Sequence, residues 1–176
     1  MALDLGRVNG RCFCTVATMG FDAAVSRYVD GLRVPLLTGT RAYLFGAARM
    51  VLTFRAPHLI LEGDFGHVEG RFVLATTANT ATYGGSMPIA PAAVPTDGML
   101  DLCLIDDAPR RRLVPLLARA VRGRHVGRPG VRFLRTRRFR IESADPRELW
   151  ADGEWIANTP AQIEVVPAAV DVMAPA

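Results

Sequence analysis

Two acidic side chains, Asp152 and Glu154, lie two residues apart in a short segment that also carries Trp150 and Trp155. Glycine follows Asp152, and an Asp-Gly dipeptide between apolar runs predicts a tight hairpin turn, because both central positions must accept positive φ. One interpretation is a hairpin tip whose charges are solvated. The other is a carboxylate pair in which one group takes the proton of a hydroxyl and the tryptophans lower the local dielectric constant. The segment by itself leaves both open.

A second group of candidate residues lies in the loops between residues 79 and 101. Asn79 begins a stretch rich in glycine, proline and small polar residues that includes Gly84 and Gly85, and such a stretch is typical of irregular structure. Paired glycines let a backbone approach a ligand closely, but their spacing matches neither a dinucleotide-binding motif nor a Walker loop. Asp97 precedes another glycine, which predicts a further turn.

The basic residues and cysteines exclude several kinds of chemistry. All 21 basic residues are arginine, which excludes a Walker-loop lysine and a Schiff-base lysine. The net charge is +4 and arginine is densest between residues 110 and 140; this segment could attract nucleic acid, anionic lipid or nucleotide phosphates, or could be a solvated face. No Cys/His cluster has zinc spacing. We expect Cys12, Cys14 and Cys103 to be buried free thiols in a reducing cytoplasm.

Length and patterning predict the fold class. Half of the 176 residues are apolar, enough for the core of one domain. No apolar run approaches the roughly 18 residues of a membrane span, and the N-terminus shows no signal-peptide pattern, so we expect a cytoplasmic protein. Helical periodicity predicts helices at residues 23–32, 40–54 and 113–121.

The other patterned segments predict short strands, because they alternate or are rich in β-branched residues between turn signals. They are residues 3–8, 11–19, 58–62, 65–69, 71–77, 99–105, 131–134, 137–143, 161–166 and 170–173, with the hairpin at Asp152. These strands come in runs and are not separated one by one by helices. The sequence therefore predicts a mainly β protein, an antiparallel β-sandwich with two or three peripheral helices.

Four segments, taken in order, carry a resemblance to a known family. They are residues 4–13 with Val-Asn-Gly-Arg, Gly-Phe-Asp-Ala at 20–23, residues 79–101 with Gly-Gly, Ile-Ala-Pro and Asp-Gly-Met-Leu-Asp, and Asp-Gly-Glu at 152–154. With this combination the chain resembles the C-terminal domain of the bacterial diacylglycerol kinase and lipid kinase family, relatives of the sphingosine kinases, over residues 3–175. The resemblance implies a β-sandwich that completes the cleft of a two-domain enzyme.

In that family, an N-terminal α/β domain carries a Gly-Gly-Asp-Gly-Thr nucleotide loop, which this sequence does not contain. We therefore expect residues 1–176 to be a single substrate-side domain that is inactive alone. The resemblance implies that an N-terminal kinase domain is its partner and binds most of the ATP. The complete enzyme would use ATP and Mg²⁺ to phosphorylate a diacylglycerol-like alcohol in phospholipid synthesis.

The resemblance also implies roles for single residues. Asp152 resembles the family's catalytic base, which takes the proton from the lipid hydroxyl, and Glu154 resembles the acidic residue beside it. Asp97 resembles an aspartate that helps to hold a structural divalent ion together with backbone carbonyls, here those of Val94 and Met99. Oxygen ligands suit Mg²⁺ or Ca²⁺. The alternative is a turn aspartate that accepts hydrogen bonds from its own backbone.

The loop that holds Asn79, Gly84 and Gly85 is expected to face the cleft and contact the nucleotide. Asn79 is either a direct ligand or an amide that braces the loop. Partners implied by the resemblance are the lipid substrate, the N-terminal domain, an anionic membrane surface in peripheral contact, and a second copy in a homodimer.

Two other function classes remain open. One is a non-enzymatic basic β-module that binds nucleic acid through Arg132, Arg135, Arg137, Arg138 and Arg140. Few aromatic residues stand between these arginines, whereas single-strand binding normally needs stacking platforms, so we expect no nucleic-acid partner. The other is a related kinase that acts on a soluble, nucleotide-like alcohol. An apolar tunnel beside Asp152 would favour the lipid, and a polar pocket would favour the soluble alcohol.

Overall fold

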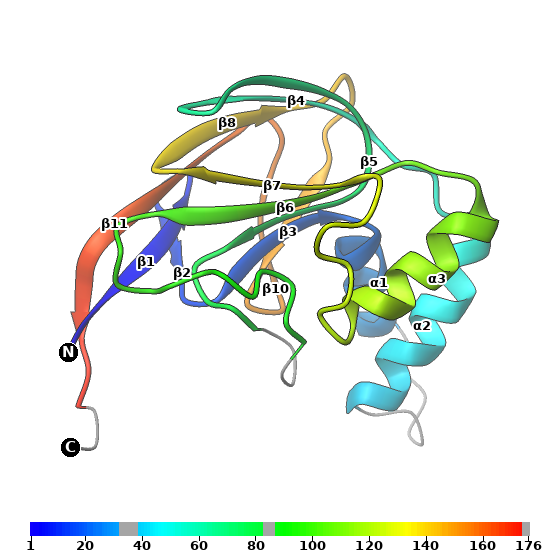
Figure 1. Cartoon of the computed structure of the whole chain (residues 1–176), viewed down its shortest axis with the longest axis horizontal. Coiled ribbons are helices and arrows are strands. Elements are labelled where there is room, and N and C mark those ends of the chain that lie inside the picture. The colour runs from blue at the N-terminus through cyan, green and yellow to red at the C-terminus, as the bar shows by residue number, and fades with distance from the viewer. Residues whose placement is uncertain (32–38, 83–86, 174–176) are drawn as a thin grey trace.

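The computed structural model describes residues 1–31, 39–82 and 87–173. Within them, eleven strands and three helices form a β-sandwich with the helices gathered at one end (Figure 1). The strands are β1 (Ala2–Val8), β2 (Arg11–Phe13), β3 (Val16–Gly20), β4 (His58–Gly63), β5 (Gly66–Ala78), β6 (Leu100–Asp106), β7 (Val131–Thr136), β8 (Arg138–Glu142), β9 (Glu148–Ala151), β10 (Glu154–Asn158) and β11 (Ala161–Asp171). The helices are α1 (Phe21–Asp30), α2 (Gly39–Thr53) and α3 (Arg110–Ala120). The predicted mainly β fold is thus confirmed.

The long strand β5 belongs to both layers of the sandwich. Its first half pairs with β4 in a sheet ordered β4-β8-β11-β1-β2, and its second half pairs with β3 and β6 in a sheet that also holds β7, β9 and β10. Every pairing is antiparallel. Because β5 crosses between the layers, the two sheets pack face to face around one apolar core.

Strand β6 shows how alternation builds two cores. Leu100, Leu102 and Leu104 belong to the core between the sheets, whereas Cys103 and Ile105 belong to a second core under the helices. Successive side chains of a strand point to opposite faces, so this strand, apolar on both faces, must be covered on both. The second core is completed by apolar residues of α1 and α3.

The helices lie together at one end of the sandwich (Figure 1), where α1 and α3 pack on apolar side chains of β3, β5 and β6. Helix α1 packs against α2, β3 and β9, and α2 also contacts α3. The entry into α1 requires glycine, because Gly20 has φ +100° and an added Cβ would lie 2.4 Å from the carbonyl oxygen of Val73. None of the described helices is long and apolar enough to cross a bilayer.

Several predicted boundaries were wrong. Residues 11–19 form two strands instead of one, since the backbone between them turns to bind a distant side chain described below. Residues 66–69 and 71–77 belong to one strand, β5, and residues 161–166 and 170–171 belong to one strand, β11. Cys12 and Cys14 are exposed, because β2 is the last strand of its sheet and the chain leaves the ladder after it; only Cys103 is buried.

Candidate functional site

The carboxylate of Asp152 is held by the break between β2 and β3. Its Oδ1 accepts hydrogen bonds from the Thr15 N–H (2.9 Å), the Thr15 hydroxyl (2.5 Å) and the Val16 N–H (3.2 Å). Among the described residues, its Oδ2 accepts one hydrogen bond, from the Cys14 N–H at 2.6 Å. Because each carboxylate oxygen has two lone pairs, Oδ2 retains an acceptor site for a further donor.

Two tight turns bring these segments together. Asn9 (φ 46°) and Gly10 (φ 88°) join β1 to β2, and Asp152 (φ 50°) and Gly153 (φ 90°) join β9 to β10. Both are the predicted hairpins, with positive φ at both central residues. The β9 strand pairs with β3, and the Asp152 N–H donates to the Val16 carbonyl at 3.1 Å. The backbone hydrogen bonds therefore position this turn independently of the contacts of the Asp152 side chain.

The hydrogen bonds also set the charge of Asp152. Partial burial raises the pKa of this carboxyl group, but the Thr15 hydroxyl and the N–H groups of Cys14, Thr15 and Val16 outweigh that effect and lower the pKa below its usual value. Asp152 is therefore ionised at neutral pH. It can accept a hydrogen bond from an alcohol, orient it, and take its proton as a bond to phosphorus forms.

A small hollow of about 260 Å³ opens beside Asp152 and is lined by both polar and apolar side chains. Glu154, the first residue of β10, lines it and is exposed. Arg11 enters from β2: its Nη1 donates to the Ile156 carbonyl at 2.8 Å, and its guanidinium lies 5.9 Å from the centre of the Trp155 ring. Figure 1 shows the edge strands β2 and β10 that bound this region. The hollow thus combines two carboxylates with one guanidinium.

Arg11 is the residue that sequence reasoning missed. It belongs to the Val-Asn-Gly-Arg segment, but nothing local assigns its side chain to Asp152, 141 positions later. With one N–H bound to Ile156, a guanidinium keeps further donors in a planar fork that suits phosphate oxygens. The sequence signal that could have indicated Arg11 was its position directly after the Asn-Gly hairpin, together with the second hairpin at Asp-Gly.

Asn79 braces the segment that holds Asp152. Its Nδ2 donates to the carbonyls of Asp4 (2.8 Å) and Cys14 (2.9 Å), and its backbone N–H donates to the Thr15 carbonyl. The side chain is buried, and its Oδ1 has no hydrogen-bond partner among the described residues. The geometry matches the loop-bracing interpretation, and a direct ligand role stays a prediction. Gly84 and Gly85 lie outside the described residues.

Asp97 lies in a turn that is linked to Asp4, since the Gly98 N–H donates to Asp4 Oδ2 at 2.7 Å. Oδ1 of Asp97 accepts from the Met99 N–H at 3.0 Å, and its Oδ2 from the Arg135 guanidinium. Arg135 also lies 3.5 Å from Asp101, whose pKa is raised by burial and only partly lowered again by Arg135. Asp101 Oδ2 is buried and unpartnered within the described part of the chain.

This donor set is only a partial fit for the implied structural ion. Mg²⁺ and Ca²⁺ prefer oxygen ligands. The possible oxygen ligands here are the carboxylates of Asp97 and Asp101 and the carbonyls of Val94 and Met99. However, Arg135 already supplies positive charge to both carboxylates. Across the described ranges, no group of three or more His, Cys, Asp or Glu side chains could hold a metal. A metal at Asp97 stays a prediction, and no step below depends on it.

The dense arginine segment is partly neutralised. Arg132 pairs with Asp106 at 2.7 Å, Arg135 with Asp97 and Asp101, and Arg140 with Glu142. Three of the five arginines proposed for nucleic acid therefore face carboxylates of their own domain. This arrangement argues against a continuous free basic surface there.

A separate apolar pocket of about 260 Å³ lies among the three helices. Its walls include Val51 of α2 and Leu117 of α3, and Phe21 and Asp22 at the start of α1. Strand β3 connects this helix start to Val16, which donates to Asp152. Five residues of strand span roughly 16 Å, about the reach of a long acyl chain.

Comparison with known proteins identifies similar chains. A family model described as the YegS C-terminal NAD kinase beta sandwich-like domain matches residues 15–174. A diacylglycerol kinase of Mycobacterium tuberculosis is 32% identical over 179 residues, covering 98% of this chain and 57% of that protein. A diacylglycerol kinase of Bacillus subtilis is 24% identical over 160 residues, covering 91% of this chain and 52% of that protein.

A solved structure of a candidate diacylglycerol kinase from Bacillus anthracis has the same fold, with a TM-score of 0.74 at 18% identity. The match covers 96% of this chain and 56% of that one. The chain therefore spans a little over half the length of the relatives it matches. The resemblance that the sequence motifs predicted is confirmed by the family model and by the M. tuberculosis protein.

Proposed function

The chain belongs to the family of YegS C-terminal NAD kinase beta sandwich-like domains, and from this membership we propose that it is the substrate-side domain of an ATP-dependent lipid kinase. Its relatives of greater length are named diacylglycerol kinases. The proposed substrate is a diacylglycerol-like alcohol. The proposed partner is a nucleotide-binding domain that completes the cleft, so the chain alone should have no turnover.

One observation carries this proposal: an ionised Asp152 with an acceptor site left on Oδ2, at the edge of a hollow shared with Arg11. An alcohol is a poor nucleophile toward a γ-phosphate, so a positioned base is the main chemical group that a kinase needs from its substrate side. We assign that role to Oδ2, since Oδ1 is occupied by three donors. Arg11 would contact the phosphoryl group as it transfers.

ATP and Mg²⁺ would be bound mainly by the partner domain. When bound, the metal would neutralise charge on the phosphate oxygens. What this chain contributes is the orientation of the alcohol, the acceptance of its proton at Asp152, and positive charge at Arg11. Glu154 adds a second negative charge beside the base.

The acyl part of the substrate would occupy the apolar pocket among α1, α2 and α3. Burial of an alkyl chain there is favourable by about 0.8 kcal/mol per methylene. Because the substrate would be extracted from a bilayer, we also propose peripheral contact of the domain with an anionic membrane surface.

The test is phosphate transfer from labelled ATP to dioleoylglycerol in mixed micelles. The chain is assayed alone and fused behind a nucleotide-binding domain of a relative. We expect transfer only in the fusion, and its loss in Asp152→Asn. Transfer to dioleoylglycerol that is unchanged in Asp152→Asn would overturn the role of this residue.

The polar lining of the hollow, with Arg11 and Glu154, favours a second candidate: a soluble, nucleotide-like alcohol as substrate. The same assay with NAD in place of dioleoylglycerol distinguishes the two. Transfer to NAD and none to the lipid would replace the first proposal with the second.

A further inference from the structure

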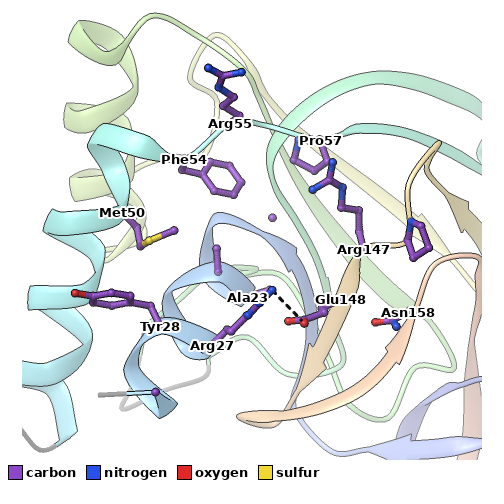
Figure 2. Close-up of a pocket in the computed structure, with 14 residues that line it drawn as sticks. Ala23, Arg27, Tyr28, Met50, Phe54, Arg55, Pro57, Arg147, Glu148 and Asn158 are labelled. Carbon is purple, nitrogen blue, oxygen red and sulfur yellow. Dashed lines mark ion pairs between the residues drawn. The ribbon is translucent and has the colours of Figure 1, made fainter. Parts of the chain in front are cut away.

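A pocket lies apart from Asp152, where α1, α2 and the start of β9 meet (Figure 2). Its volume is about 620 Å³, within the usual range of 300–1,000 Å³ for small-molecule sites. Glu148 lines it, whereas Asp152 follows the other end of β9. Glu148 and Asp152 are four positions apart along the chain, which corresponds to roughly 13 Å of strand. The pocket is therefore distinct from the hollow beside Asp152.

Arginine dominates the charge of this pocket. Arg27, Arg55 and Arg147 line it, against one carboxylate, Glu148. Figure 2 shows the Arg27–Glu148 pair on one side of the pocket and Arg55 and Arg147 toward the other. The lining therefore carries three guanidiniums and one carboxylate, and Asp145, which is not part of the lining, pairs with Arg147.

These guanidiniums are available to a ligand. Arg27 lies 3.3 Å from Glu148 with 71% of its side chain exposed, and Arg147 lies 3.6 Å from Asp145, whose side chain is 81% exposed. Exposed pairs of this kind contribute little free energy. Arg55 is exposed and makes no ion pair with any described residue.

The remaining wall is apolar. Ala24 of α1, Met50 of α2, and Phe54 and Pro57 beyond α2 line the pocket. The Phe54 ring is fixed by an edge-to-face contact with Phe21, at a centroid distance of 5.6 Å and an angle of 86°. Such a wall can accept an alkyl chain without rearranging.

One amide adds a directed donor. Asn158 lines the pocket, and its Oδ1 accepts from the indole N–H of Trp155 at 3.2 Å. This contact assigns the orientation of the amide, so its Nδ2 is the atom that can donate to a ligand. Among the described residues, the lining then offers guanidinium and amide donors and one carboxylate, Glu148, which is paired with Arg27.

We propose that this pocket binds an anionic amphiphile, an alkyl or acyl chain that carries a phosphate monoester. A phosphate monoester has a charge of about −1.5 to −2 at neutral pH, opposite in sign to the three arginines of the lining. Guanidinium forks bind phosphate oxygens in pairs, and the Met50–Phe54 wall receives the chain. The proposal does not depend on the kinase reaction, although the product of that reaction would belong to the same chemical class.

The experiment uses the 176-residue chain and lauroyl lysophosphatidate below its micelle concentration, with binding measured by titration calorimetry. Monolauroylglycerol lacks the phosphate, glycerol 3-phosphate lacks the chain, and ATP carries phosphates without an alkyl chain. We expect lysophosphatidate to bind at least about tenfold more tightly than any of the three, because only it uses both parts of the pocket. The affinity should fall with added salt.

Variants locate the site. Arg55→Ala and Arg147→Ala should each weaken lysophosphatidate binding by roughly tenfold, the loss of one charge-assisted contact. Ala24→Met should also weaken lysophosphatidate binding, because the larger side chain narrows the apolar part of the pocket while every charge stays in place. Arg124→Ala is the matched control, because Arg124 is exposed and lies outside the pocket; it should bind as the wild type does.

Three results would overturn the proposal. They are equal binding of monolauroylglycerol and lysophosphatidate, equal or tighter binding of ATP, and equal losses in Arg124→Ala and Arg55→Ala. Circular dichroism of each variant checks that it is folded. If Arg147→Ala does not fold, Arg147→Gln removes the same charge and keeps more of the side chain.

Discussion

Thr15 donates two hydrogen bonds to Oδ1 of Asp152, one from its backbone N–H and one from its hydroxyl, across 137 positions of sequence. Its carbonyl accepts from the N–H groups of Asn79 and Thr80. A single residue in the gap between β2 and β3 thus joins the end of β5 to the β9–β10 turn. The candidate base is rigid because its support is part of the sandwich itself.

Replacement of Asp152 should separate catalysis from structure when it is compared with Thr15→Val. In the fusion with a nucleotide-binding domain, Asp152→Asn should lower kcat by about 10²- to 10⁴-fold, the usual effect of losing a general base. Thr15→Val retains the carboxylate and should lower the free energy of unfolding by about 1.5 kcal/mol, the loss of one hydrogen bond to a charged group. Lipid phosphorylation and urea unfolding of both variants check this. Equal kcat in the two would show that Asp152 acts only through stability.

The lowered pKa of Asp152 predicts the pH dependence of stability. In the folded state this carboxyl group has a pKa below its usual value of 3.8, so the unfolded state binds more protons between the two values. The contribution of Asp152 is therefore fully present above the unfolded pKa and is lost as the pH falls through the folded one. Urea midpoints measured from pH 6 to pH 3 should fall more steeply for the wild type than for Asp152→Asn. Parallel curves would contradict the assignment.

The three thiols should differ in reactivity. Burial raises the pKa of Cys103 to about 12, and thiolate is the reactive form. Cys12 and Cys14 are exposed. Titration of the native chain with Ellman's reagent near pH 8 should therefore detect two thiols, and the denatured chain three. A native chain in which all three react at similar rates would place Cys103 elsewhere than under the helices.

Removal of the Asn79 amide should destabilise the fold. Asn79→Ala leaves the carbonyls of Asp4 and Cys14 without their donor. We expect a loss of about 2 kcal/mol in the free energy of unfolding, because Asn79 and Asp4 are buried. Thr80→Ala, which removes only an exposed contact to Thr82, is the control and should change stability little. Chemical denaturation of the two variants measures the difference.

Two glycines with similar φ should respond differently to alanine. At Gly20 (φ +100°) an added Cβ meets the Val73 carbonyl oxygen at 2.4 Å, whereas at Gly66 (φ +93°) it meets nothing within 4 Å. Gly66→Ala should cost about 1–2 kcal/mol from the left-handed backbone alone. Gly20→Ala should cost more, because α1 must also move away from β5. Thermal unfolding measures the stability that each variant loses. Equal losses would show that the contact with the Val73 carbonyl does not contribute.

Local sequence patterns determined the hairpins, the burial of β6 and the fold class of this protein. The Asn9-Gly10 and Asp152-Gly153 hairpins follow from local φ requirements, and the two-sided burial of β6 follows from apolar residues on both of its faces. The fold class and the family followed from such patterns too. Each depends on contacts between residues that are near in sequence, which local rules can read.

Tertiary structure alone decided how the site is assembled. The division of residues 11–19 into β2 and β3, the support of Asp152 by Thr15, the approach of Arg11, and the pairing of Asp97 with Arg135 all join residues far apart in sequence. The exposure of Cys12 depends likewise on β2 being an edge strand. A backbone N–H that donates to a distant carboxylate has no local sequence signature, because the same residues could equally continue the strand. The end of β2 is therefore determined by the position of Asp152 in the folded sandwich.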